Sequence, residues 1–411
     1  YIDMHSVCSS VSSGALQVFE DLPIRNISAW NRLIGAYTKY GHCEKVLACM
    51  ENMQIEGVLP DATTFVLSLK ACGNLGAIER GREIHAEVKR NGLLQRDLRV
   101  GNSVVHMYTK VGLLGIAQEV FDSLPERDIA SWNTLMTGYI THGQGELALN
   151  CFDQMQGESL FPNAITFICG VKACCGIGGI VKGREIHVQV ERLGLLEREV
   201  CVGNALVHMY AKKGWMDMAH DIFSKLPAPN VVSWNSLISG YAELGQGNEV
   251  LKCFDEMQVK GVYPDVITYV YSLKSCGEIG AREKGRNIHI EVERKGFLKN
   301  NCFVSNALVD MYAKCGFFSI AREVFDTLLV RDIISWNSLI SGYVEYGYGE
   351  DALKCYEEMQ HEGIHPDVVT LTSALSACSH KGLLDEGCNI FELIQENHDI
   401  SLTIDHLNCL A

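Results

Sequence analysis

The chain has 411 residues, a formal net charge of −15 and no apolar stretch long enough to cross a lipid bilayer. Hydrophobic residues make up 47% and charged residues 21% of the chain, which is typical of a folded protein rather than a disordered one. The negative charge argues against a protein that coats phosphates with lysine and arginine, although a groove can differ locally from the whole.

The 17 cysteines are scattered, and no two stand in a C-x-x-C arrangement. We therefore expect most of them to be small buried side chains in a reducing compartment. No targeting signal stands at the start of the sequence. Because the chain opens at Tyr1, inside a repeat, this leaves open a targeting segment that precedes it.

A period of 102 residues runs through the chain. It is clearest in four tryptophans, each followed by an asparagine: Trp30, Trp132, Trp234 and Trp336. The segment GREIH at 81–85 keeps the same step, returning at 183–187 and, with one change, at 285–289. A fixed period of this kind predicts a repeat protein.

Each period divides, in chain order, into units of 35, 36 and 31 residues. A partial repeat at 1–26 precedes them. The predicted triplets are 27–61, 62–97 and 98–128, then 129–163, 164–199 and 200–230, then 231–265, 266–301 and 302–332. An incomplete closing triplet follows at 333–367, 368–403 and 404–411.

The unit at 231–265 shows why each unit is predicted to form two helices. Apolar residues from Trp234 to Tyr241 recur at i, i+3, i+4 and i+7, and a second stripe runs from Val250 to Met257. Glycines separate the two stripes, and a glycine followed by a proline ends the second. One helix pair cannot bury its own stripe, so neighbouring pairs must stack into an α-solenoid with a long concave groove.

Two families of helix pairs have a period close to these units. The tetratricopeptide pattern W-x₂-L-G-x₂-Y fits Trp234, Leu237 and Tyr241, but Ile238 replaces its glycine. The segments VVSWNSLISGYAELGQGNEVLKCFDEMQVKGVYPD (231–265), LKACGNLGAIERGREIHAEVKRNGL (69–93) and VSNALVDMYAKCGFFSIAREVFDTLLVRD (304–332) instead resemble pentatricopeptide repeats. The triplet order resembles the plant-type PLS subfamily, and residues 374–411 resemble the triplet that closes its repeat array.

This resemblance implies an all-α fold, a right-handed α-solenoid superhelix of stacked helix-turn-helix pentatricopeptide repeats. It also implies that each repeat contacts one RNA base through its fifth and last residues, since amides and carboxylates can hydrogen-bond an unstacked base edge. The residues carried over as base-binding are Asn31, Asp61, Asn102, Asp128, Asn133, Asn163, Asn204, Asn230, Asn235, Asp265, Asn306, Asp332, Asn337 and Asp367.

In the family, Asn with Asp favours uracil and Asn with Asn favours pyrimidines generally. The second unit of each triplet carries weak or silent pairs instead: Val66/Asp97, Ile168/Glu199, Val270/Asn301 and Thr372/Thr403. The implied target is single-stranded and pyrimidine-rich, roughly U-n-U-Y-n-Y-U-n-U-U. In the alternative interpretation, each asparagine is a structural residue that bonds the loop of the next unit.

Zinc deaminases attack cytosine with an H-x-E motif and a distant P-C-x-x-C. His85-Ala86-Glu87 and His289-Ile290-Glu291 fit the first part, but the middle copy has Gln189 and no P-C-x-x-C exists. Cys174-Cys175 is an adjacent pair on a helix, and Gly178-Gly179 lacks the Lys-Ser/Thr of a phosphate loop. We therefore expect no catalytic site, no metal site and no cofactor in this chain.

The leading hypothesis is a sequence-specific binder of organellar RNA, the targeting array of a C-to-U RNA-editing factor in mitochondrion or chloroplast. Its partners would be single-stranded RNA and organellar editing accessory proteins, with no DNA and no membrane. Two alternatives are a solenoid that binds a peptide, which the acidic charge favours, and an RNA stability or splicing factor. The sequence leaves open which organelle is involved and whether a deaminase domain follows.

Overall fold

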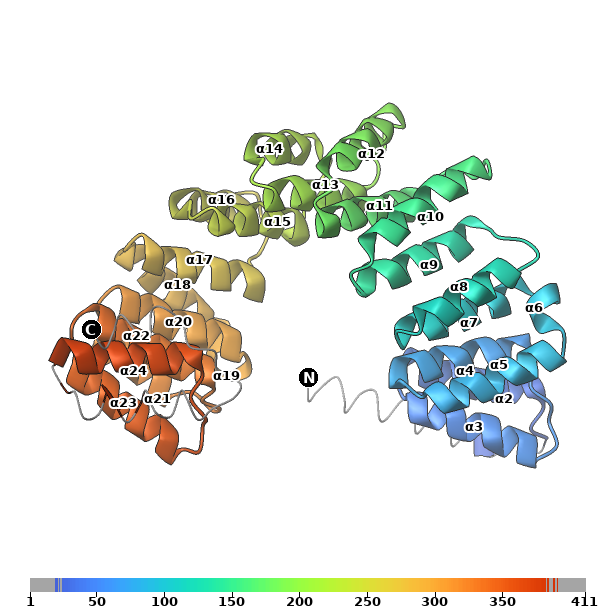
Figure 1. Cartoon of the computed structure of the whole chain (residues 1–411), viewed down its shortest axis with the longest axis horizontal. Coiled ribbons are helices and arrows are strands. Elements are labelled where there is room, and N and C mark those ends of the chain that lie inside the picture. Colours follow the sequence, from blue (N-terminus) through green and yellow to red (C-terminus); the bar gives the residue numbers. More distant parts are fainter. Residues whose placement is uncertain are drawn as a thin grey trace. The chain divides into compact units, whose positions relative to one another are not determined.

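The computed structural model describes residues 19–20, 22, 24–381, 383, 387–388 and 390. Every regular element in these residues is a helix (Figure 1). The chain divides into two compact units that meet between Ala205 and Leu206. The predicted closing unit at 404–411, Thr403 and residues 1–18 of the partial repeat lie outside the described residues.

The first unit holds α2 (Ile27–Lys39), α3 (Cys43–Ile55), α4 (Ala62–Leu75), α5 (Ile78–Arg90), α6 (Leu93–Arg96), α7 (Leu98–Lys110), α8 (Leu114–Ser123), α9 (Ile129–Thr141), α10 (Gly145–Gly157), α11 (Ala164–Ile177) and α12 (Ile180–Arg192). Helix α13 (Val200–Lys212) contains the boundary. The second unit continues with α14 (Met216–Lys225), α15 (Val231–Glu243), α16 (Gly247–Val259), α17 (Val266–Glu278), α18 (Arg282–Arg294), α19 (Phe297–Asn300), α20 (Cys302–Lys314), α21 (Phe318–Asp326), α22 (Ile333–Glu345), α23 (Gly349–His361) and α24 (Val368–Lys381).

Successive helices pack as hairpins, and the first helices of successive hairpins lie side by side. In the first unit α2 contacts α4, α4 contacts α7, α7 contacts α9 and α9 contacts α11. In the second unit α15, α17, α20, α22 and α24 follow one another in the same way. Each unit is therefore a stack of helical hairpins, and the predicted all-α solenoid architecture is confirmed within each of them.

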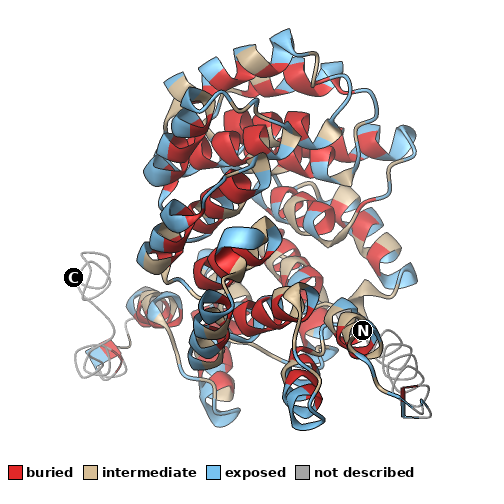
Figure 2. Cartoon of the chain, turned by 90° about the vertical axis from the view of Figure 1, so that its right-hand side faces the viewer, coloured by how far each residue is buried: buried red, intermediate tan, exposed pale blue. Residues whose placement is uncertain are grey.

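The repeated tryptophan fills the contact between one hairpin and the next. Trp132 on α9 packs edge to face against Phe121 on α8, with ring centroids 4.7 Å apart. The same contact joins Trp234 to Phe223 at 4.6 Å and Trp336 to Phe325 at 4.5 Å. Figure 2 shows the buried residues along the helix sides that face neighbouring helices. An aromatic pair of this kind adds about 0.5–1.5 kcal/mol to the area that it buries.

First helices begin at a side-chain cap. Asp265 before α17 accepts a hydrogen bond from the backbone amide of Thr268, whose hydroxyl bonds back to the amide of Asp265. This reciprocal pair satisfies two amides that the helix itself leaves without a partner. The same box, with Ser or Thr at its third helical position, opens α4, α9, α11, α15 and α22.

Second helices begin without a side-chain cap, after a left-handed turn. In the hairpin of α15 and α16, Gly245 adopts φ 68°, a conformation that costs little only for glycine. The loops that follow second helices also contain a left-handed residue, which is glycine at Gly57 and Gly261. In the equivalent loop after α10, Ser159 adopts this conformation instead, with φ 63°. Ser159 is the one described residue other than glycine with a positive φ.

Side chains from the next hairpin also close the ends of first helices. The imidazole Nε2 of His142 hydrogen-bonds the carbonyl oxygen of Thr109 at 2.8 Å, at the end of α7. The hydroxyl of Tyr346 donates to the carbonyl oxygen of Lys314 at 2.8 Å, at the end of α20. These bonds satisfy carbonyls that a helix end leaves exposed, and they fix one turn against the next.

Candidate functional site

The asparagine that follows each tryptophan is bonded to the last residue of its own unit. The Asn31 amide nitrogen Nδ2 donates to Asp61 Oδ1 at 2.9 Å. Asn235 reaches both carboxylate oxygens of Asp265, at 2.9 and 3.1 Å. Asn337 does the same with Asp367, at 3.0 and 3.1 Å. The two residues of each predicted pair therefore lie together in these units.

The last residue of a unit is also the cap of the next first helix. Asp265 caps α17, and the Thr268 hydroxyl inside that cap donates to Asn235 Oδ1 at 2.6 Å. The asparagine is thus held at both ends of its amide, and its side chain is only 9% exposed. This is the hydrogen bond to the next loop that the alternative interpretation of the asparagine predicts.

The remaining pairs vary this arrangement. Asn306 donates to both oxygens of Asp332 at 3.0 and 3.1 Å, and Asn133 donates to Asn163 Oδ1 at 3.2 Å. In the predicted pair of Asn204 and Asn230, Asn204 lies in the first compact unit (Tyr1–Ala205). Asn230 lies in the second compact unit (Leu206–Ala411) and caps α15.

Hydrogen bonds stabilise the charged form of two of these carboxylates. Burial acts to raise the pKa of Asp61, but bonds from the Thr64 backbone amide and from Asn31 outweigh it and lower that pKa. At Asp128, bonds from Ser131 and the Asn102 side chain overcome burial in the same way and lower the pKa. Both carboxylates are therefore ionised at neutral pH and present acceptor oxygens.

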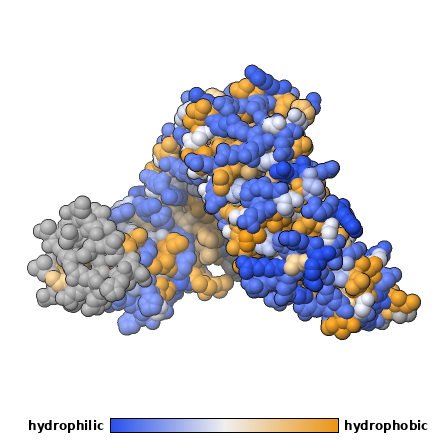
Figure 3. All heavy atoms as spheres, turned by 45° about the vertical axis from the view of Figure 1, so that its right-hand side comes forward, coloured by the Kyte–Doolittle hydropathy of each residue, from blue (hydrophilic) through white to orange (hydrophobic). Residues whose placement is uncertain are grey.

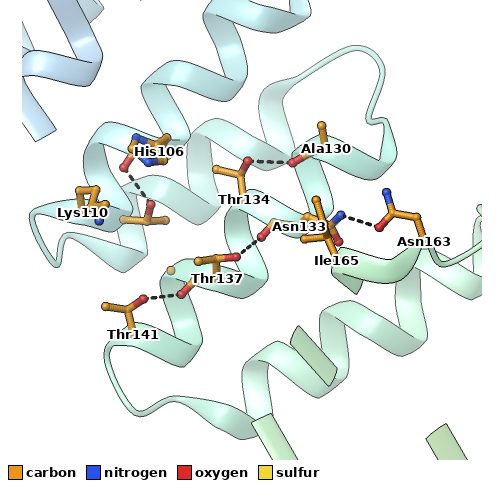
Figure 4. A pocket seen from close by; sticks show the side chains of 11 residues that line it. His106, Lys110, Ala130, Asn133, Thr134, Thr137, Thr141, Asn163 and Ile165 are labelled. Atoms are coloured by element: carbon orange, nitrogen blue, oxygen red, sulfur yellow. Dashed lines mark hydrogen bonds between the residues drawn. The ribbon is translucent and has the colours of Figure 1, made fainter. Parts of the chain in front are cut away.

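A hollow of about 350 Å³ opens beside the pair of Asn133 and Asn163 (Figure 4). Threonines of α9 line one wall, and their hydroxyls donate to carbonyl oxygens of the same helix. Exposed Ile165 lies next to the amides, while His106 and Lys110 enter from α7. The hollow thus offers an amide edge, an apolar side chain and a cation together.

The charge of this hollow differs from that of the whole chain. Burial, helped by the nearby ammonium groups of Lys110 and Lys70, lowers the pKa of His106. His106 is therefore neutral at pH 7. Neither lysine forms an ion pair with a described carboxylate, so a local positive field lies beside the Asn133 amide within an acidic protein.

A second set of surface residues was not predicted from the sequence. Apolar residues reach the surface in many places (Figure 3), and six that are each 51–63% exposed share the second position of a unit. These are Ile165, Val232, Ile267, Phe303, Ile334 and Val369. The second and fifth positions lie one helical turn apart on the same face. The 102-residue period could have predicted these positions, because it places an apolar residue in the same register at Ile165, Ile267 and Val369.

The second unit of each triplet presents a different surface. The fifth residues Val66, Ile168 and Val270 are half-buried hydrocarbons, and the Thr372 hydroxyl donates to the Val368 carbonyl at 2.6 Å. Asn301, the last residue of the third such unit, caps α20. No amide therefore stands at the fifth position in these units.

The motifs that resemble a zinc deaminase have structural roles. The imidazole Nδ1 of His85 lies 3.0 Å from the Tyr108 hydroxyl, and that of His289 lies 2.9 Å from the Tyr312 hydroxyl. Both cysteines of the adjacent pair, Cys174 and Cys175, are buried. Within the described ranges, no group of His, Cys, Asp and Glu is arranged to hold a metal ion, and no helix is long and apolar enough to cross a membrane.

The comparisons with known proteins agree on one family. The PPR repeat family matches residues 25–74, 127–176, 229–278 and 331–380, and the PPR repeat matches 204–228, 303–333 and 369–398. A chloroplastic pentatricopeptide repeat-containing protein of Arabidopsis thaliana is 36% identical over 409 residues, covering 100% of this chain and 50% of the relative. A putative mitochondrial one from the same plant is 32% identical over 410 residues, covering 99% and 68%. The chain spans half the length of the first of these relatives.

A solved structure supports the fold. Maize PPR10, a pentatricopeptide repeat protein crystallised in complex with an 18-nt psaJ RNA element, matches with a TM-score of 0.72. The match covers 92% of this chain and 56% of PPR10, at 18% sequence identity. At that identity the likeness concerns the fold alone.

Proposed function

Because this chain belongs to the pentatricopeptide repeat family, we propose that it binds single-stranded RNA and reads one base with each asparagine-bearing repeat. The observation that carries the proposal is the recurring pair of an amide and a last residue at hydrogen-bond distance, as in Asn235 and Asp265. An RNA-bound structure of the same fold, that of PPR10, adds support.

The chemistry of the pair suits a pyrimidine. An asparagine amide nitrogen carries two hydrogens. Asn235 donates one of them to Asp265, which leaves the other for a base carbonyl. The carboxylate of Asp265 only accepts, and uracil presents an N3–H donor between its carbonyls. In the pair of Asn133 and Asn163 the second amide can donate or accept, so cytosine fits there as well as uracil.

The exposed apolar side chains would cover the faces of the bases. Ile165 lies beside the Asn133 amide in the hollow of Figure 4, one turn from the fifth position of its own unit. A base whose edge meets the amides would lay its flat face against such a side chain. Units whose fifth residue is Ile168 or Val270 would contribute this face and no edge contact.

The finer proposal concerns the biological role. The triplet order resembles the PLS subfamily, and relatives bear the words chloroplastic and mitochondrial in their names. We propose that the chain is the targeting array of an organellar C-to-U editing factor. A loss-of-function plant should lose editing at a cytosine close to a sequence of the form U-n-U-Y-n-Y-U-n-U-U; unchanged editing with altered transcript abundance or splicing would point to the alternative role.

Binding of the purified chain to labelled RNA tests the base assignment. The unit of Asn235 would read the seventh base of UAUUAUUAUU, so the matched probe is UAUUAUGAUU. The wild type should prefer uracil at that base, and Asn235→Thr should shift the preference toward guanine by about tenfold, or about 1.4 kcal/mol. Asn337→Thr is the control, because it should alter only the tenth base.

Three outcomes would count against the proposal at different levels. An unchanged preference of Asn235→Thr at the seventh base would overturn the register. Equal binding to a purine-rich scramble or to the matching DNA would overturn base-specific RNA recognition. Correct helical folding with no RNA binding would favour the peptide-binding solenoid. A dependence on salt weaker than that of basic RNA binders is expected, because base contacts dominate.

A further inference from the structure

Four aromatic rings contact one another around the α20–α21 and α22–α23 turns, and Phe317 precedes Phe318 in the chain without a ring contact to those four. We call Phe317, Phe318, Tyr343, Tyr346 and Tyr348 the aromatic patch. Phe318 lies at its centre, stacked on Tyr343 with centroids 4.5 Å apart and an interplanar angle of 17°. Tyr348 and Tyr346 meet Phe318 edge to face, at 5.3 and 5.5 Å. The patch joins the α20–α21 turn to the α22–α23 turn, between helices that Figure 1 labels.

The repeat itself supplies one of these rings, since Tyr37, Tyr139 and Tyr241 occupy the register of Tyr343 in the other three periods, but it does not require the rest. In the first compact unit, Leu113 and Leu114 stand where Phe317 and Phe318 stand two periods later. His142 and Gln144 stand there in the register of Tyr346 and Tyr348. Within the second unit, Leu244 and Gln246 stand where Tyr346 and Tyr348 stand one period later. Trp215 and Tyr40 place a ring at the Phe317 and Tyr346 positions of other periods, whereas Leu114 and Met216 stand at the Phe318 position and Gln144 and Gln246 at the Tyr348 position. The addition of Phe318 and Tyr348 is therefore what concentrates the rings at this place.

The patch is exposed and held in position. Phe317 is 37% exposed, Tyr346 47% and Tyr348 51%. The hydrogen bond from the Tyr346 hydroxyl to the Lys314 carbonyl fixes one ring, and stacking on Tyr343 fixes Phe318. A rigid cluster of half-exposed rings loses little conformational freedom when it binds a partner, which is a property of interaction surfaces.

One guanidinium already lies on the patch. The Arg282 carbon Cζ is 5.0 Å from the centroid of Phe317, within the range of a cation–π contact. The other neighbouring cations are neutralised, since Lys314 pairs with Asp310 at 2.9 Å and Arg322 pairs with Glu358 at 2.8 Å. Among the described residues, no cation lies over the ring of Tyr343, Tyr346 or Tyr348.

Two carboxylates lie next to the turn that carries Tyr346 and Tyr348. Glu345 and Asp351 flank the α22–α23 turn, are exposed and form no ion pair with any residue that the structure describes. The pKa of Tyr343 is raised by burial first, with the charges of Cys355 and Asp351 adding to it, which places the Asp351 charge close to the rings. Such a border repels phosphate and attracts cations, so it disfavours RNA at this surface.

We propose that the aromatic patch binds an arginine side chain of a net-positive segment of a partner protein. Arginine suits the surface better than lysine, because a planar guanidinium stacks on aromatic faces and is more weakly hydrated. The carboxylates of Glu345 and Asp351 supply the complementary charge. This surface is independent of the asparagine pairs, so it holds whether or not the chain reads RNA.

Fluorescence polarisation with three labelled peptides of equal length tests the proposal. They consist of Arg-Gly-Gly, Lys-Gly-Gly or Gln-Gly-Gly repeats and are measured on the full chain at physiological salt, which screens the diffuse attraction of the acidic protein. The patch variant combines Phe317→Leu, Tyr346→Leu and Tyr348→Gln, residues that the fold already accepts in the same register. Asp351→Asn tests the border, and Glu243→Gln is a control in the register of Glu345, where Leu244 and Gln246 replace Tyr346 and Tyr348.

The arginine peptide should bind the wild type more tightly than the lysine peptide, and the glutamine peptide should not bind. The patch variant should bind the arginine peptide about tenfold more weakly and Asp351→Asn severalfold more weakly, while Glu243→Gln should match the wild type. The proposal is wrong if the patch variant, shown by circular dichroism to be folded, binds as the wild type does, or if no peptide binds. Loss of RNA binding in the patch variant with unchanged peptide binding would show that the rings belong to an RNA surface instead.

Discussion

Removing the Asp265 carboxylate should loosen the start of α17 by more than the loss of an ordinary helix cap. In Asp265→Ala the backbone amide of Thr268 loses its acceptor at 2.9 Å, which costs about 1 kcal/mol for a cap. The Asn235 amide loses its acceptor as well, and because its side chain is 9% exposed, an unsatisfied donor there costs about 1–3 kcal/mol. The expected total is about 2–4 kcal/mol.

Asp97→Ala is the matched control. Asp97 caps α7, and its carboxylate bonds the backbone amide and side chain of exposed Arg99, with no asparagine partner. Its removal should therefore cost about 1 kcal/mol. Hydrogen exchange followed by mass spectrometry suits the comparison, because stacked repeats open locally and a single melting temperature would average over them.

A double-mutant cycle with Asn235→Ala isolates the coupling. If the amide and the carboxylate stabilise each other, the combined variant should be less destabilised than the sum of the single variants by about 1 kcal/mol or more. Additivity within about 0.5 kcal/mol, together with equal effects of Asp265→Ala and Asp97→Ala, would refute the reasoning. The pair would then be two independent groups that happen to lie close together.

Three further predictions concern backbone strain, packing and pH. Ser159→Gly should stabilise the chain by about 1 kcal/mol in urea unfolding, because Ser159 holds a left-handed conformation, and Gly57→Ser in the equivalent loop should cost a similar amount. Gly342→Ala should destabilise by about 1–3 kcal/mol, since its Cβ would lie 2.6 Å from the Cβ of Ala313. Gly35→Ala meets no atom within 4 Å and should raise the free energy of unfolding by about 0.5–1 kcal/mol. Burial lowers the pKa of His85 below its ordinary value of 6.5. Below pH 6.5 this imidazole is therefore protonated more readily in the unfolded chain than in the folded chain. The free energy of unfolding should consequently fall as the pH drops from 6.5 toward the lower pKa of the folded state. In His85→Gln this fall should be smaller, and a pH dependence equal to that of the wild type would contradict the account.

The helices could be predicted from the sequence because their signal is local. The apolar stripe from Trp234 to Tyr241 lies within α15 (Val231–Glu243), and the stripe from Val250 to Met257 lies within α16 (Gly247–Val259). Amphipathic spacing at 3.6 residues per turn determines which side of a helix is buried, whatever the rest of the chain does. The 102-residue period then extended this reasoning from one hairpin to the next.

The contacts of the candidate site could not be predicted in the same way. Asn235 and Asp265 are 30 residues apart, and whether they bond depends on how one hairpin stacks on the next. The tight turn that brings Tyr346 over the end of α20 depends on the same stacking. Periodicity also gives no warning that α6 (Leu93–Arg96) forms after α5, while the residues after α12 form only turns.

On the proposed base reading, the last residue of a unit has two roles, and its role as a helix cap limits how such an array can change its target. A substitution at Asp265 that alters the base edge presented to RNA also alters the start of α17. Only a few short polar side chains, chiefly Ser, Thr, Asn and Asp, cap a helix well. New specificities that keep the fold intact are therefore drawn, at the last position of a unit, from that small set.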